Sequence, residues 1–294
     1  MIEPVLKDDA FLVDVQASNR MDEDFRLWWL GQSGFLLQWR GGHVLLDPYL
    51  SDSLTAKYAS TDNPHIRMTA RVVDPARLNF IDAVSTSHAH TDHLDSDTLA
   101  PLLHASPRLE LVVPDAIRDD AAARLAIPAA TLNGLDDGHS VTIGEFRFTG
   151  VPSAHEDVER DGAGRCRYLG YVVQFGPWTI YHSGDTVLYG GMVERLRRFS
   201  IDVALLPING RSPKRRVPGN LNACEAAWLA RQIAARTVIP CHYEMFTFNT
   251  ARPEEFRTAA EEQQQRCHIL RCAERWESSQ LLGAPAGLRR PIGK

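Results

Sequence analysis

The chain has 294 residues, of which 44% are hydrophobic and 23% are charged. This composition is typical of a soluble globular protein and excludes a disordered, collagen-like or coiled-coil chain. Lysine and arginine total 32 against 37 aspartate and glutamate residues, which gives a net charge of -5. A chain with this charge lacks the positive field that attracts phosphate backbones, so we expect no nucleic-acid partner.

The sequence contains no recognisable targeting or membrane-spanning segment. Its first residues show no basic stretch followed by an apolar run, and 18 consecutive apolar residues occur nowhere. The five cysteines include no Cys-x-x-Cys pair, so they predict neither a disulfide framework nor a thiolate zinc site. We therefore expect a cytoplasmic protein with no membrane partner.

The first third of the chain has the pattern of a β-meander. Short apolar runs separated by glycine-containing turns predict strands at 26–30, 35–39 and 43–47. The stretch 51–80 is less regular. It is followed by an apolar segment at 82–87, which predicts another strand, and by helical composition at 95–104.

The remainder alternates strand and helix patterns. Strands are predicted at 109–114, 140–151, 168–175, 177–182, 202–207 and 237–240, and helices at 115–127, 191–199 and 222–236. Asn222 and Glu225 have the spacing of a capping box at the start of the last helix. Because no Gly/Ser-rich linker interrupts this pattern, we expect one domain over 1–294.

Seven residues, 87–93, carry the most informative motif, S-H-A-H-T-D-H. In an extended or turning segment His88 and His90 can point one way while Asp92 and His93 turn to another, so one loop offers ligands to two adjacent metal ions. A solvated polar loop would explain a lone histidine, but it is the weaker explanation for this density. The motif also follows a predicted strand, where sites in α/β sheets gather.

The motif resembles the HxHxDH signature of the metallo-β-lactamase superfamily. The other ligands of that family match His155 in VPSAHE, Asp185 in HSGDT and His242 in IPCHYEMF, each after a predicted strand. The resemblance extends roughly from Trp28 to residue 250. It implies an α/β fold of the four-layer αββα class, in which two mixed β-sheets pack face to face with helices outside.

The resemblance also implies a division of the ligands between two metal ions. His88, His90 and His155 would bind one ion, and Asp92, His93 and His242 would bind the other, with Asp185 bridging both. Imidazole and carboxylate ligands suit zinc, manganese or iron. The family favours two divalent ions that are zinc or manganese.

Several branches of the superfamily fit less well than others. True β-lactamases have Cys or Ser in place of Asp185, and flavodiiron proteins have Glu in place of His90. RNA-processing members share all seven ligands, but the negative net charge gives little support for a basic exosite. The stretches YHSGDTVLYG, DVALLPING and GNLNACEAAWLARQIAARTVIPCHYEMFTFN are most similar to the branch of L-ascorbate-6-phosphate lactonase.

This resemblance implies a hydrolase with a dinuclear site. Two divalent ions about 3.5–4 Å apart lower the pKa of a bridging water towards about 7, so that hydroxide attacks a substrate at neutral pH. Asp92 and Asp185 are the predicted catalytic residues, and the expected substrate is a small, anionic ester or lactone. A phosphodiesterase or amidase-like hydrolase is the alternative, and a non-catalytic metal-stabilised binding protein is a weaker one.

Three further features have two interpretations each. Asp47 resembles a superfamily aspartate that supports the histidine loop, but an Asp before Pro in a turn explains it equally well. His182 is more simply a histidine packed at a strand end than a proton donor. The basic loop 211–216 could reach a substrate phosphate, although most such charge runs are solvated. An exposed apolar helix face could support a homo-oligomer.

Overall fold

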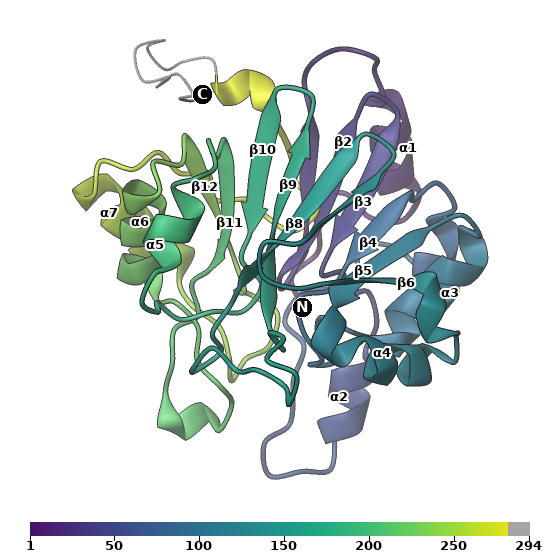
Figure 1. Cartoon of the computed structure of the whole chain (residues 1–294), viewed down its shortest axis with the longest axis horizontal. Coiled ribbons are helices and arrows are strands. Elements are labelled where there is room, and N and C mark those ends of the chain that lie inside the picture. The colour runs from purple at the N-terminus through teal and green to yellow at the C-terminus, as the bar shows by residue number, and fades with distance from the viewer. Residues whose placement is uncertain (282–294) are drawn as a thin grey trace.

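Two mixed β-sheets lie face to face in the computed structural model, which describes residues 1–281 (Figure 1). The seven-stranded sheet has the order β13 (Arg275–Glu277), β1 (Arg26–Gly31), β2 (Gly34–Trp39), β3 (Gly42–Leu46), β4 (Ala83–Ser85), β5 (Glu110–Pro114) and β6 (Leu132–Leu135). The six-stranded sheet has the order β12 (Thr237–Cys241), β11 (Val203–Pro207), β10 (Trp178–His182), β9 (Leu169–Phe175), β8 (Phe146–Pro152) and β7 (Ser140–Ile143).

Each sheet is antiparallel in one half and parallel in the other. In the seven-stranded sheet, β13, β1, β2 and β3 pair antiparallel, whereas β3 to β6 are parallel. In the six-stranded sheet, β7 to β10 are antiparallel, and β10, β11 and β12 are parallel. The antiparallel pairs follow short turns, as the glycine-containing segments predict.

Helices cover the outer face of each sheet. Helices α1 (Asp9–Ala17), α3 (Ser96–Ala105) and α4 (Arg118–Leu125) lie on one side, and α5 (Met192–Leu196), α6 (Ala223–Gln232) and α7 (Pro253–Glu262) lie on the other (Figure 1). A short helix, α2 (Ser53–Tyr58), projects beyond one end of the sheets. This layering confirms the predicted αββα fold class.

The central strands are buried on both faces because a second sheet covers one face and helices cover the other. Every residue of β1 and β2 is buried. Adjacent tryptophans on β1 pack in opposite directions: Trp28 meets Phe11 of α1 edge to face at 6.4 Å, and Trp29 stacks on Tyr243 at 4.2 Å. Both tryptophans are therefore core residues, as the sequence indicates.

The capping box predicted from Asn222 and Glu225 is present. The Asn222 side chain accepts a hydrogen bond from the Glu225 amide at 2.9 Å, and the Glu225 carboxylate accepts one from the Asn222 amide at 3.0 Å. The helix ends at Gln232 rather than at 236, because Ala234 adopts a left-handed backbone with φ 54°. The helix predicted at 115–127 is shorter for the same reason, since Ala126 also has φ 54°.

Several elements escape prediction because their periodicity is short or absent. These are α1, α2, β6, α7 and β13. The three residues of β13 return the chain to the edge of β1, where Leu27 is opposite Trp276. The single domain over 1–294 stays a prediction, and its last part, 282–294, lies outside the described residues. No helix within residues 1–281 is long and apolar enough to cross a membrane.

Replacement of Trp276 by alanine should destabilise the protein strongly. The indole is 1% exposed and lies 5.6 Å from the ring of Phe25, so its removal leaves a large cavity. We expect a loss of about 3–5 kcal/mol in the free energy of unfolding, measured by urea denaturation. The matched control is Trp228→Ala on the 39%-exposed α6 residue, where we expect a change of about 0.5 kcal/mol. Equal losses in both variants would contradict a structural role for β13.

Candidate metal centre

The seven predicted ligands lie where four strands of the two sheets end. The loop 88–93 follows β4, and His155 follows β8. Asp185 comes three residues after the end of β10, and His242 comes directly after β12. The first loop belongs to the seven-stranded sheet and the other three positions belong to the six-stranded sheet, so the site lies between the two layers.

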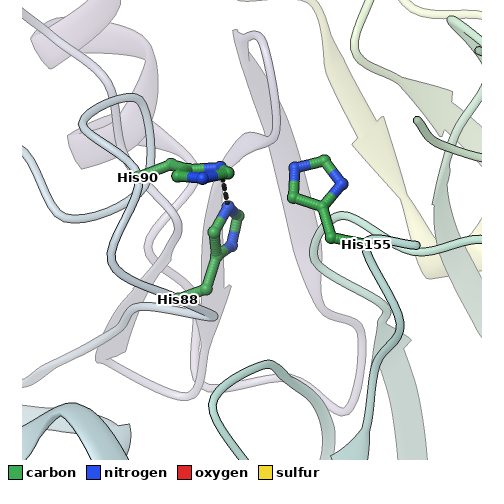
Figure 2. A group of neighbouring side chains, drawn as sticks. All are labelled: His88, His90 and His155. Carbon is green, nitrogen blue, oxygen red and sulfur yellow. Dashed lines mark hydrogen bonds between the residues drawn. The ribbon is translucent and has the colours of Figure 1, made fainter. Parts of the chain in front are cut away.

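One group consists of three histidines. A ligand atom of each of His88, His90 and His155 lies within 4.8 Å of the others, and the three rings converge on one point (Figure 2). His88 Nε2 is 2.9 Å from His90 Nδ1, so two ring nitrogens face each other directly. This arrangement of three imidazoles can hold a divalent ion.

A second group adjoins the first. It consists of Asp92, His93 and His242, whose ligand atoms also lie within 4.8 Å of one another. The Asp92 carboxylate is 3.7 Å from His93 Nε2 and 3.9 Å from His242 Nε2. These residues offer one oxygen and two nitrogen atoms to a second ion.

Asp185 lies between the two groups. One of its carboxylate oxygens is 3.4 Å from His93 Nε2, and the other is 3.5 Å from His155 Nε2 and 3.2 Å from His242 Nε2. The carboxylate therefore contacts histidines of both groups. The structure thus brings all seven residues together, and their assignment as metal ligands remains our prediction.

The glycine before Asp185 is required by a close approach. Gly184 has φ 58°, and a Cβ added to it would lie 2.4 Å from the Cβ of Ser87. Any larger residue would push Asp185 away from the histidine loop. In the S-G-D motif, steric contact with Ser87 therefore requires the glycine, and the chemistry of the site requires the aspartate.

Asp47 supports the histidine loop through hydrogen bonds. Its carboxylate accepts hydrogen bonds from the Ser87 amide at 2.6 Å, from the Ser87 hydroxyl and from His93 Nδ1 at 2.6 Å. Because Nδ1 of His93 donates to Asp47, Nε2 is the nitrogen that faces the site and would bind an ion through its lone pair once the ring is neutral. The contacts favour the supporting role for Asp47 over the simple turn.

Two other histidines are oriented in the same way. Nδ1 of His155 donates to the backbone carbonyl of Gly219 at 2.8 Å, which leaves Nε2 facing Asp185. Nδ1 of His88 is 2.9 Å from the hydroxyl of Ser87. Hydrogen bonds behind the rings thus direct their Nε2 atoms inwards.

The sequence did not single out Gln32. This residue belongs to the turn between β1 and β2, has φ 49°, and donates through Nε2 to Asp92 at 2.7 Å. The same nitrogen is 3.1 Å from His242 Nε2. The neighbouring Ser33 hydroxyl is 3.5 Å from Asp185. The polar composition of this turn is the one local signal of such a role. The contact with Asp92 could not be predicted, because strand pairing in the sheet brings together residues that are 60 positions apart.

Tyr168 also escaped prediction. Its ring centre lies 5.1 Å from that of His88, 6.2 Å from that of His90 and 5.7 Å from that of His155. The phenol therefore forms a wall of the three-histidine group. His182 takes no part in either group: it is buried, and its Nε2 lies 2.8 Å from the Ser33 carbonyl oxygen.

The buried charges of the site determine its protonation. Burial opposes the charged form of Asp185, but His242 and His93 hold the pKa of that carboxyl well below its usual range. Burial also opposes the charged form of His93, but the carboxylates of Asp185 and Asp47 raise its pKa well above the usual value. Burial lowers the pKa of His88 and of His90, which keeps both imidazoles neutral.

These features fit a divalent metal ion. His93 Nε2 is buried and has no hydrogen-bond partner among the described residues, although two carboxylates lie near it. An unpaired buried nitrogen is costly unless a ligand satisfies it. Neutral His88 and His90 and an ionised Asp185 are in the protonation states that metal binding requires, whereas at His93 an ion would displace a proton.

Comparisons with known proteins agree with this geometry. The model of the Beta-lactamase superfamily domain matches residues 43–243. A UPF0173 metal-dependent hydrolase from Opitutus terrae is 33% identical over 240 residues, which covers 80% of this chain and 92% of the relative.

Solved structures show the same fold. The metallo hydrolase Igni18 from Ignicoccus hospitalis aligns with a TM-score of 0.63 at 19% identity, covering 86% of this chain and 98% of that one. The metallo-β-lactamase fold protein YhfI from Bacillus subtilis aligns with a TM-score of 0.61 at 18% identity, covering 87% and 100%. The chain therefore belongs to the metallo-β-lactamase superfamily and is a metal-dependent hydrolase of its UPF0173 family.

Proposed function

We propose that the protein is a dinuclear metal-dependent hydrolase that uses two zinc or two manganese ions. The position of Asp185 carries this proposal, because its two carboxylate oxygens contact histidines of both groups. A single-ion site would need only one of the two groups. Seven convergent ligand residues exceed what one four-coordinate ion requires.

Two ions bound in this way would lower the pKa of a shared water and polarise the bond to be cleaved. The chain's own residues prepare the site for that chemistry. Asp185 stays ionised because His242 and His93 lower its pKa against the effect of burial. Asp92 is held by the Gln32 amide, which fixes its orientation.

The proposed substrate is a small, anionic ester or lactone, such as the sugar lactone phosphate that the lactonase branch hydrolyses. Support comes from the likeness of YHSGDTVLYG and of the stretch from DVALLPING onwards to that branch. We propose a small molecule as the only partner, with neither nucleic acid nor membrane involved. Whether the protein works as a homo-oligomer is a separate question that gel filtration answers.

Asp185→Asn should abolish hydrolysis while it preserves the fold. The amide is isosteric but removes the negative charge shared by the two groups, so we expect activity to fall more than about 100-fold. Ring opening of L-ascorbate-6-phosphate, with zinc or manganese present, is the assay. The control is Asp137→Asn, because Asp137 pairs with Arg195 at 2.6 Å and belongs to neither ligand group.

Either outcome of that assay is informative. Turnover above the Asp185→Asn blank supports the lactonase-like substrate. Absence of turnover in a protein that binds two ions would contradict that substrate, and the same protein would then be assayed with phosphodiesters and amides, the substrates of the alternative hydrolase.

Removal of the metal should reduce both activity and thermal stability. Ions that bind only the folded chain stabilise it by about 2.7 kcal/mol at a free concentration of 100 times Kd. We therefore expect chelation to lower Tm, and elemental analysis of the loaded protein to give two ions per chain. One ion per chain at saturation would contradict the dinuclear proposal.

Asp47→Asn should weaken metal binding without removing a ligand. An amide can still accept from Ser87, but it no longer fixes the proton of His93 on Nδ1. We expect metal affinity to fall about 10–100-fold, measured by competition with a chromogenic chelator. The matched control is Asp82→Asn. Asp82 accepts a hydrogen bond of 2.8 Å from the backbone amide of His43 and belongs to neither ligand group. An equal loss in both variants would argue against a role for Asp47 in orienting His93.

A further inference from the structure

A second site candidate lies beside the loop that follows β11. A cavity of about 680 Å³ opens there, and none of the seven predicted metal ligands lines it. Its charged lining consists of Arg211, Arg215, Arg252 and Glu255. Arg211 and Arg252 have carboxylate partners in Glu225 and Glu255, so the unbalanced positive charge of this lining is that of Arg215.

The basic loop 211–216 divides into paired and unpaired arginines. Arg211 makes a two-pronged contact with Glu225, at 2.6 and 2.9 Å. Arg216 pairs with Asp62 at 2.8 Å. Both of these guanidinium groups therefore have a carboxylate partner already, and neither needs a further anion.

Arg215 differs from its neighbours because its acceptors are all neutral. Nη1 donates to the Asn209 carbonyl and to the Asn249 side chain at 3.2 Å, and Nη2 donates to the Thr250 carbonyl at 3.1 Å. Within residues 1–281 no carboxylate lies at ion-pair distance from this guanidinium. Three of its five N–H donors are thereby used, which leaves the Nε–H and one Nη2–H.

A partly buried cation without a counter-charge is unfavourable. Burial lowers the pKa of Arg215, and no neighbouring carboxylate opposes this shift. Guanidinium groups bind carboxylate and phosphate oxygens through two parallel N–H donors. An oxyanion in the cavity would supply both the missing charge and the missing acceptors.

The backbone around the cavity has the same polarity. Asn222 is the N-cap of α6 and Arg252 is the N-cap of α7, and both residues line the cavity. Both ten-residue helices therefore begin at the cavity, where their N-terminal partial positive charge is matched in part by Glu225 on α6 and by Glu254 and Glu255 on α7. Glu255 is the one carboxylate in the lining, and it is 3.7 Å from Arg252.

We propose that this cavity binds an oxyanion, the phosphate or carboxylate group of a small ligand, with Arg215 as its principal contact. None of the seven predicted metal ligands lines this site, and the proposal does not depend on the proposed reaction. The chain that continues from the basic loop contacts the predicted metal centre, because the Gly219 carbonyl accepts a hydrogen bond from His155. An anion that orders this loop would therefore act on the support of one predicted metal ligand.

Cys224 provides a reporter inside the cavity. It is a free, exposed thiol in the lining, whereas Cys166, Cys241 and Cys272 are buried. The experiment compares alkylation of Cys224 by iodoacetate, an anion, with alkylation by neutral iodoacetamide, using peptide mass spectrometry on the full chain. Because both reagents need the same access, the ratio of their rates measures local charge.

Arg215→Gln should lower the iodoacetate-to-iodoacetamide ratio about threefold or more, since a change of one kT in potential alters local anion concentration about threefold. Arg216→Gln is the matched control, because it removes the same charge from the same loop at a residue paired with Asp62. We expect its ratio to stay near that of the wild type. Equal ratios in the wild type and Arg215→Gln, or equal falls in both variants, would overturn the proposal.

Protection by anions tests binding itself. At constant ionic strength set with chloride, phosphate or acetate should slow Cys224 alkylation by iodoacetamide in the wild type and not in Arg215→Gln. Phosphate alone, acetate alone or both identify which oxyanion group the site accepts. Arg215→Lys keeps the charge but loses the two parallel donors, so it should keep the rate ratio and lose protection. No protection by either anion in the wild type would refute the site.

Discussion

The buried carboxylate of Asp185 is the constraint on which the site depends. A charge in this position is favourable only because imidazoles of both groups surround it, with His242 at 3.2 Å and His93 at 3.4 Å from one group and His155 at 3.5 Å from the other. The same contacts lower its pKa and raise that of His93. Two ligand groups that share one carboxylate cannot move independently, so the two sheets that carry them must hold a fixed relative position.

The sheets supply that position through their ordinary packing. Each ligand segment begins where a buried strand ends, so the core that fixes the strands also fixes the ligands. Gly184 allows the last close approach, since any Cβ there would collide with Ser87. Asp47, on the turn after β3, then binds Ser87 and His93. The positions of the strand ends, which the fold determines, therefore place the supporting residues beside the predicted ligands.

The sequence predicts the metal ligands more readily than the residues that support them. His88, His90, Asp92 and His93 are adjacent in the chain, so a local motif predicts them together with the fold that presents them. Gln32 lies 60 residues from its partner Asp92, and no periodicity signals that contact. The same limit applies to β13, whose three residues form a strand only because the edge of β1 is available to them. Long-range pairing, rather than local propensity, decides such features.

The orphaned nitrogen of His93 connects metal binding to folding. Its Nδ1 donates to Asp47, so Nε2 is left buried beside two carboxylates, without a hydrogen-bond partner among the described residues. The ring cannot turn away to relieve this cost, because Asp47, which also binds the Ser87 amide, holds its Nδ1. A metal ion held by His93, Asp92 and Asp185 would remove this cost. The free energy of metal binding is in this sense part of the stability of the fold.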